Sequence, residues 1–183
     1  GGTLMLYGNA PTFSDFLSPA GGVIGNGSST TPVTLTLNPS TDVVYSGAFT
    51  NGSIAGSTQP LALVKNGGSR LTLTGRSGAT GGFTVNGGTL ALGVGGSAGC
   101  MYGTITMQPG TILLSLVGDS FGYNGGIAQV TNLVLNGASL IHTPAGNLTL
   151  WNNLPINMTG GYMAATNTGG GRLDLGTGTF VNT

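Results

Sequence analysis

The amino-acid sequence contains very little charge. Its 183 residues include four lysines and arginines, four aspartates and no glutamate, so charged residues make up 4% of the chain and the formal net charge is zero. A typical soluble domain carries about 25% charged residues. Binding to nucleic acid or to an anionic membrane depends on clustered positive charge. The composition therefore gives no electrostatic basis for either partner.

Residues that can carry out chemistry are also scarce. His142 and Cys100 are the only histidine and cysteine, so the sequence predicts no disulfide framework, metal site or cofactor. A glycan-cleaving enzyme needs paired carboxylates, but the acids are scattered: Asp15, Asp42, Asp119 and Asp174. We expect a non-catalytic protein, with Cys100 as a small buried residue and His142 hydrogen-bonded at a strand end. No apolar run reaches the roughly 18 to 20 residues of a membrane-spanning helix.

Glycine, in contrast, is abundant, with 37 residues. It marks a slow repeat, in which an alternating apolar stretch is followed by a tight turn and a second apolar stretch. Successive copies begin 22, 28 and 23 residues apart. A period in the twenties, built from short strands and turns, predicts a solenoid of stacked coils. The four copies are Phe83–Leu92 (FTVNGGTLAL), Ile105–Leu114 (ITMQPGTILL), Leu133–His142 (LVLNGASLIH) and Ile156–Ala165 (INMTGGYMAA).

The predicted fold class is all-β. Period-two alternation predicts strands at Val33–Leu37, Leu71–Thr74, Thr104–Met107 and Leu148–Leu150. An Asn-Gly turn is also typical of an antiparallel hairpin, so a sandwich is the alternative. The recurrence of one strand–turn–strand unit favours a parallel β-helix. Its structural turn glycines are predicted to be Gly67, Gly87, Gly88, Gly110, Gly137, Gly160 and Gly161.

We expect residues 1–183 to form a single β-solenoid segment with irregular rungs and surface loops. Residues 11–32 and 115–126 are predicted loop insertions, the second of which packs its aromatic residues against the rod. The chain opens in mid-repeat and closes on a strand-like sequence, so we expect uncapped ends that are covered by further coils or by neighbouring copies.

The most specific pattern lies in residues 63–93. Its first half contains Lys65, Gly67, Leu71, Leu73 and Gly75, and its second half contains Gly81, Gly82, Val85, Gly87, Gly88, Leu90 and Leu92. This pattern resembles the autotransporter-associated β-strand repeat, also called the passenger-associated transport repeat. It departs from the family where Ser69 replaces a glycine and where Gly78-Ala79-Thr80-Gly81 lacks the usual tyrosine.

The resemblance implies a right-handed parallel β-helix, secreted to a bacterial cell surface or the medium, that acts as a scaffold without an active site. We therefore expect a non-catalytic structural protein of a fibre, stalk or filament, which self-associates end to end and is open to glycan decoration. The alternatives are the passenger stalk of an adhesin, a glycan-active enzyme and, from the paired Thr-x-Thr motifs, an ice-binding surface.

Overall fold

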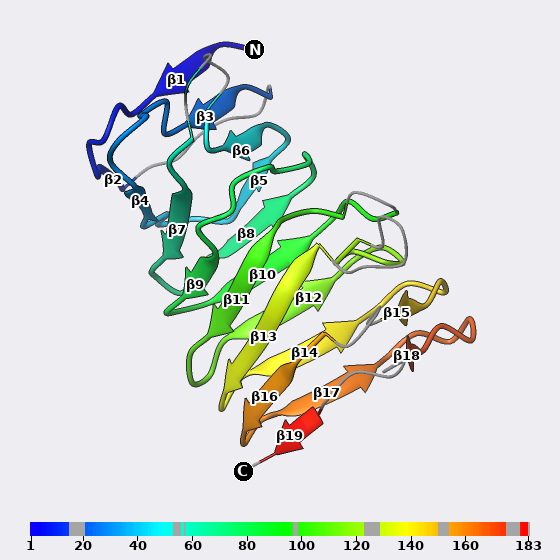
Figure 1. Cartoon of the computed structure of the whole chain (residues 1–183). Helices are drawn as coiled ribbons and strands as arrows, with labels where there is room; N and C mark the ends of the chain where they lie inside the picture. The colour runs from blue at the N-terminus through cyan, green and yellow to red at the C-terminus, as the bar shows by residue number, and fades with distance from the viewer. Residues whose placement is uncertain are drawn as a thin grey trace.

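The computed structural model is a stack of short parallel strands, with the two chain ends at opposite ends of the stack (Figure 1). It describes residues 1–14, 21–52, 56, 58–96, 99–122, 129–149, 154–174 and 180–182. Within these ranges the regular elements are all strands, and every strand pair is parallel. The prediction of an all-β solenoid is therefore confirmed. In these ranges no helix has the length and apolar character needed to cross a membrane.

Two long sheets form two sides of the solenoid. The larger has eight strands: β2 (Thr12–Phe13), β4 (Val33–Leu37), β7 (Leu61–Lys65), β9 (Phe83–Val85), β11 (Gly103–Met107), β13 (Val130–Asn136), β16 (Ile156–Thr159) and β19 (Phe180–Asn182). The smaller has six: β5 (Val43–Tyr45), β8 (Arg70–Leu73), β10 (Thr89–Leu92), β12 (Ile112–Ser115), β14 (Ser139–His142) and β17 (Tyr162–Ala165).

A third side is less regular. It carries a three-stranded sheet at one end, made of β1 (Thr3–Met5), β3 (Val23–Gly25) and β6 (Ala48–Thr50). A two-stranded sheet of β15 (Leu148–Thr149) and β18 (Leu173–Asp174) lies near the other end. Each full coil therefore runs along the eight-stranded sheet, turns a tight corner, runs along the six-stranded sheet and returns over the third side.

The repeated strand–turn–strand unit forms this tight corner. In the first copy, β9 belongs to the eight-stranded sheet and β10 to the six-stranded sheet, and each pairs with strands of the neighbouring coils rather than with the other. The Asn-Gly turn therefore changes direction between two sheets and does not close a hairpin. The antiparallel alternative is wrong for this chain.

The core consists of inward-facing columns, in which each residue stacks on the equivalent residue of the next coil. In the eight-stranded sheet one column contains Leu35, Leu63, Phe83, Ile105, Leu133 and Ile156. In the six-stranded sheet one column contains Val43, Leu71, Leu90, Leu113, Leu140 and Met163. Except for Met163 in β17, the outermost strand of its sheet, these side chains are buried. Burial of such alternate positions is what the period-two pattern predicted.

The longest coil keeps its register by means of a bulge. Gly103 pairs with Val130, but Thr104 pairs with Asn132, so Thr131 has no partner in β11. A bulge of this kind adds one residue to a strand without displacing the pairs that follow it. The columns therefore continue through the coil that carries the widest spacing between repeats.

The two predicted insertions have different outcomes. Thr12–Phe13 pairs with β4, and Val23–Gly25 pairs with both β1 and β6. A loop insertion spanning 11–32 is therefore wrong at these strands, which are too short to show alternation, while residues 15–20 lie outside the described residues. In the segment 115–126, Phe121 is fully buried in the core, as predicted for a loop that packs on the rod. Tyr123 lies outside the described residues.

The corner glycines satisfy two different steric demands. Positive φ angles occur at most of the predicted positions: Gly67, Gly88, Gly110, Gly137, Gly160 and Gly161. Gly87 is not among the positive-φ residues, but a Cβ there would lie 2.9 Å from the carbonyl oxygen of Gly67 in the neighbouring coil. Gly88 combines both demands, because its φ is +69° and a Cβ would lie 2.3 Å from the carbonyl oxygen of Ser69.

We predict that Gly88→Ala lowers the free energy of unfolding by about 3 kcal/mol or more. The left-handed conformation costs an alanine about 1–2 kcal/mol, and the overlap with the backbone of the next coil adds to that cost. Gly68→Ala is the matched control, because a Cβ at Gly68 meets nothing within 4 Å. Urea denaturation of both variants measures the difference, and equal stabilities would contradict the steric argument.

Candidate functional site

Three of the four aspartates predicted to be scattered are among the described residues, and they lie on different coils. Asp42 precedes β5, and its Oδ1 accepts a hydrogen bond from the backbone N–H of Arg70 at 2.8 Å. Asp119 has a φ of +49°, and its Oδ1 accepts from the backbone N–H of Thr149 at 3.2 Å. The Asp119 side chain therefore links its turn to the backbone of β15. Asp15 lies outside the described residues.

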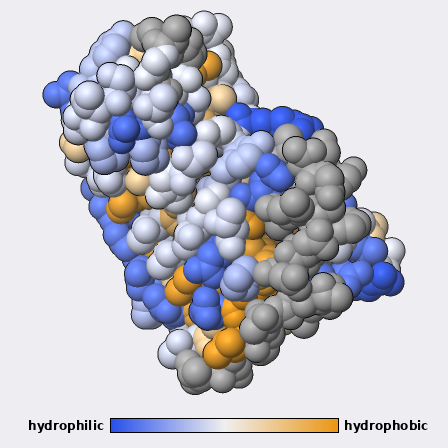
Figure 2. Space-filling model, in the orientation of Figure 1, coloured by the Kyte–Doolittle hydropathy of each residue, from blue (hydrophilic) through white to orange (hydrophobic). Residues whose placement is uncertain are grey.

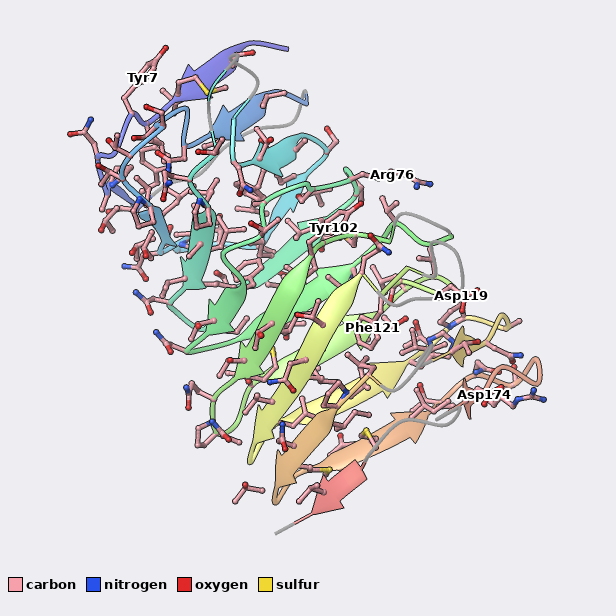
Figure 3. The ribbon with its side chains drawn as sticks, in the orientation of Figure 1. Tyr7, Arg76, Tyr102, Asp119, Phe121 and Asp174 are labelled. Carbon is pink, nitrogen blue, oxygen red and sulfur yellow. The ribbon has the colours of Figure 1, made fainter. Side chains whose placement is uncertain are left out.

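Figure 3 shows Arg76, Asp119 and Asp174 at separate levels along the stack. Asp174 accepts a hydrogen bond from Arg172 at 3.3 Å, in an exposed ion pair that contributes little to stability. No group of three or more potential metal-binding side chains occurs among the residues that the structure describes.

Lys65 is buried, although a lysine is almost always found at the surface unless its charge has partners. It is the last residue of β7 and points inward, in the column that contains Leu37, Lys65, Val85, Met107, Leu135 and Met158. Its exposed fraction is 0%. Burial of an ammonium group without partners is very costly, so its hydrogen bonds decide whether the position is tolerated.

The partners of Lys65 are backbone carbonyl groups from two successive corners. Its Nζ donates to the carbonyl oxygens of Gly67 at 3.0 Å, Gly87 at 2.8 Å and Asn66 at 3.4 Å. Next to this contact, Asn86 Nδ2 donates to Asn66 Oδ1 at 2.8 Å. The ammonium group thus ties together two adjacent corners. Burial lowers the pKa of Lys65, and the negative charge of Asp42 partly opposes this shift.

A second buried polar cluster joins the six-stranded sheet to the third side. Ser115 of β12 and His142 of β14 are in register, and Ser115 Oγ lies 2.9 Å from His142 Nδ1. Ser120 donates a hydrogen bond to Ser115 Oγ at 3.0 Å. His142 Nε2 contacts the carbonyl oxygen of Gly146. All three side chains have an exposed fraction of 0%.

The chemistry of this cluster follows from the contact with Gly146. A carbonyl oxygen only accepts, so Nε2 of His142 carries a proton and, in the neutral ring, Nδ1 accepts from the Ser115 hydroxyl. The carbonyl oxygen of Val117, 3.0 Å from Ser115 Oγ, competes with His142 Nδ1 for the single hydroxyl proton. A serine beside a histidine is the pair used in nucleophilic catalysis. Here the ring is oriented by a backbone carbonyl group, and both side chains are fully enclosed.

His142 therefore lies at a strand end with hydrogen bonds on both nitrogens, as its sequence context predicted. The contact with Ser115 was not predicted. The sequence signal for this contact is weak, because it consists only of two polar residues at inward positions of neighbouring coils.

Cys100 is fully buried, as predicted. Its Sγ lies 3.5 Å from the carbonyl oxygen of Leu73, and burial raises the pKa of the thiol to about 12. Asn26, the first residue of one Asn-x-Ser/Thr triplet, is also fully buried. Its Nδ2 donates to the carbonyl oxygen of Thr31 at 2.7 Å, so this amide serves the fold rather than a glycan.

The threonine pairs do not share one face. Thr34 with Thr36, and Thr104 with Thr106, point outward from the eight-stranded sheet, whereas Thr72 points outward from the six-stranded sheet. A shallow groove of about 230 Å³ crosses the first face, with Thr34, Gly82 and Thr104 among its uncharged lining residues. This arrangement does not give the single flat array that ice binding requires.

We predict that Lys65 makes stability rise with pH in alkaline solution, relative to Lys65→Met. The pKa of Lys65 lies below its ordinary value of 10.5 in the folded chain. Between the folded and unfolded values, the unfolded state binds more protons, so stability increases as the pH rises through that window. Burial raises the pKa of both Tyr45 and Cys100 to about 12, which acts in the opposite direction.

The contributions of Tyr45 and Cys100 are common to both proteins and cancel in the difference. The measurement is therefore urea denaturation of the parent chain and Lys65→Met, from neutral pH up to 10.5. Stability curves that stay parallel over the whole range would contradict the assignment to Lys65.

We predict that Ser115→Ala lowers the free energy of unfolding by about 1–3 kcal/mol, because His142 Nδ1 loses its buried donor. Ser120→Ala in the same background should cost less than it does alone, since its acceptor is already gone. Ser139→Ala, at a partly exposed outward position of β14, is the control and should change stability by less than about 0.5 kcal/mol. Strict additivity of Ser115→Ala and Ser120→Ala would show that the two hydroxyl groups do not interact.

Comparison of the chain with protein-family models, with curated proteins and with solved structures gives no match in any of the three. The arrangement of the residues themselves therefore carries the functional argument.

Proposed function

We propose that this chain is a non-catalytic structural segment of an extracellular β-solenoid, which serves as a fibre, stalk or filament on a bacterial cell surface. The single observation that carries the proposal is the continuous parallel strand pairing along the two long sheets. It gives the chain the form of a rod with repeating sides (Figure 1).

The burial and hydrogen bonding of the reactive side chains support this proposal. Lys65, Ser115 and His142 are enclosed and bonded to neighbouring coils, and Cys100 is packed in the core. The cation, the imidazole and the hydroxyl group all hold coils together. A scaffold needs these contacts between coils, and it needs no substrate pocket around them.

The outermost strands support self-association end to end. In the described part of the chain, no strand pairs with the outer edge of β1 or of β19. Such edges present backbone N–H and C=O groups that can bind a further parallel strand. Tyr162 on β17 and Val181 on β19 are 53% and 42% exposed, and each would gain a stacking neighbour from a further coil. That coil can come from the same chain or from another copy.

The uncharged, threonine-rich surface suits an extracellular scaffold that carries glycans. Figure 2 shows hydrophobic residues in small groups among pale and hydrophilic ones on the face in view. The outward positions of the eight-stranded sheet are mainly small, uncharged residues, with Thr36, Val64, Thr84, Thr106 and Val134 in one column. The threonine hydroxyl groups of such a surface are open to glycan attachment.

The proposal is tested by negative-stain electron microscopy of the purified chain over a concentration series, with the protomer mass determined on the same sample. We expect filaments of uniform width whose length increases with concentration. Fibre diffraction should show a repeat of about 4.8 Å along the filament axis, which is the spacing between parallel strands.

The remaining outcomes separate the alternatives. Rods of fixed length, made by one long chain that contains this segment, would favour the stalk of an adhesin passenger. Single particles without rod shape at every concentration would overturn the structural proposal. Hydrolysis of a polysaccharide by the purified chain, abolished by His142→Ala in a variant that still folds, would favour an enzyme.

A further inference from the structure

Two successive corners of the solenoid carry the same Asn-Gly-Gly sequence. It occupies Asn66–Gly68 between β7 and β8, and Asn86–Gly88 between β9 and β10. In an Asn-Gly dipeptide the backbone nitrogen of the glycine can attack the side-chain carbonyl carbon of the asparagine, because glycine has no Cβ to obstruct the approach. The two corners therefore hold the same reacting groups in different surroundings.

Two hydrogen bonds polarise the groups that would react at Asn66. Its side-chain Oδ1 accepts from Asn86 Nδ2 at 2.8 Å, which draws electron density away from the side-chain carbonyl carbon. Its main-chain carbonyl oxygen accepts from Lys65 Nζ at 3.4 Å. When the N–H of Gly67 loses its proton, the negative charge is shared with that main-chain oxygen, so the ammonium group stabilises the attacking form.

A proline in the neighbouring coil leaves the main-chain carbonyl group of Asn66 open to Lys65. Leu37 pairs with Lys65, so the parallel register places Pro39 beside Gly67, and a Cβ at Gly67 would lie 3.2 Å from the carbonyl oxygen of Pro39. A backbone N–H at the position of Pro39 would bond to the Asn66 carbonyl oxygen in a regular ladder, but proline has none. The oxygen therefore keeps its contact with the ammonium group.

The attacking N–H of Gly67 is also available. In the described part of the chain the structure gives it no hydrogen-bond acceptor, and Gly67 and Gly68 are exposed to the water that the reaction consumes. At a third Asn-Gly pair the corresponding N–H, that of Gly137, donates to the carbonyl oxygen of Thr159 at 2.6 Å. The nitrogen that would attack Asn136 is therefore held in the ladder.

Asn86 has the same local sequence in a less favourable setting. Lys65 Nζ donates to the carbonyl oxygen of Gly87 at 2.8 Å, which is one peptide group beyond the reacting one. The corner is also tighter: a Cβ at Gly88 would lie 2.3 Å from the backbone of the neighbouring coil, whereas one at the equivalent Gly68 meets nothing within 4 Å. Asn86 is thus an internal reference for the reaction.

We propose that Asn66 is a site of intramolecular deamidation that is promoted by Lys65 and Asn86. Gly67 N forms a bond to Asn66 Cγ, and the bond from Cγ to the side-chain nitrogen breaks. That nitrogen leaves as ammonia, with the proton from the Gly67 N–H. Water then opens the resulting cyclic imide at one of its two carbonyl groups and gives aspartate or isoaspartate.

The modification changes the surroundings of the buried ammonium group. It places a carboxylate in the residue next to Lys65 and makes the formal net charge of the chain negative instead of zero. The isoaspartate product also adds one carbon atom to the main chain, which alters the position of the Gly67 carbonyl group relative to Lys65 Nζ. The proposal concerns the chemistry of one corner and does not depend on the structural role given above.

Mass spectrometry of the purified chain, incubated in mildly alkaline buffer and sampled over time, tests the proposal. Trypsin releases Asn66–Arg70, and chymotrypsin releases residues 84–90 and 136–140, so each site is read separately against a zero-time baseline. We expect Asn66 to deamidate about tenfold faster than Asn86 in the folded chain, as one charge-assisted hydrogen bond allows. In urea, where the hydrogen bonds are lost, the two identical sequences should react at equal rates.

Two variants test the promoting contacts. Lys65→Met and Asn86→Ala each remove one hydrogen bond to Asn66 and should slow its deamidation by about threefold or more. Gln108→Ala is the matched control, because Gln108 follows Asn86 in the same column, one coil further from Asn66, and the rate should stay unchanged. If Lys65→Met fails to fold, Asn86→Ala, at an exposed corner position, carries the test.

Equal rates at Asn66 and Asn86 in the folded chain, or a rate at Asn66 that is unchanged in Asn86→Ala, would each overturn the proposal. Neither result bears on filament formation, which electron microscopy detects independently.

Discussion

The hydrogen bonding of each strand to the equivalent strand of the next coil is the interaction on which the rest of this structure depends. Because the register is parallel and unshifted over most of its length, equivalent residues stack directly on one another. The packing of each residue therefore depends on its neighbours in the column as well as on those in its own coil. Leu, Ile, Val, Phe and Met are interchangeable inside the columns as long as their volumes fill the same layer.

Polar residues enter the columns only where a corner supplies partners. Lys65 stands at the end of a strand, where the carbonyl groups of two corners converge on its Nζ. Ser115 and His142 also stand at strand ends, next to the loops that carry Ser120 and Gly146. The interiors of the strands, in contrast, are apolar on the inward side. The same rule therefore explains the apolar core and the buried polar clusters, because backbone groups not used by the ladders are found at the corners.

Much of the fold could be predicted from the sequence, since its causes are local. Period-two alternation located β4 and β11, and the turn glycines located the corners, because both depend on a few neighbouring residues. The strands inside 11–32 could not be predicted, because two or three residues are too few to show alternation. The burial of Lys65 was also missed, since one of its partners, Gly87, lies 22 residues away in sequence.

The contact between Ser115 and His142 shows how a repeat alignment can mislead. Alignment of the repeats from their first residues pairs Leu114 with His142, whereas the structure pairs Ser115 with it. The difference arises at the corner, where four residues lie between Met107 and Ile112, but only three lie between their register partners Leu135 and Ser139. Strand register is set by hydrogen bonds, and the corners absorb differences in length that an ungapped alignment cannot show.

The bulge at Thr131 has a consequence for engineering. It allows the longest coil to keep its columns aligned, with Ile105 still stacked on Leu133, although that coil carries extra residues on the third side. Length can therefore vary on that side without a change in the two long sheets. Peptide epitopes or enzyme-recognition tags grafted there, one for each coil, would be displayed in a single file at a pitch set by the strand spacing of about 4.8 Å. The order of the grafted groups along the rod would follow the order of their positions in the sequence.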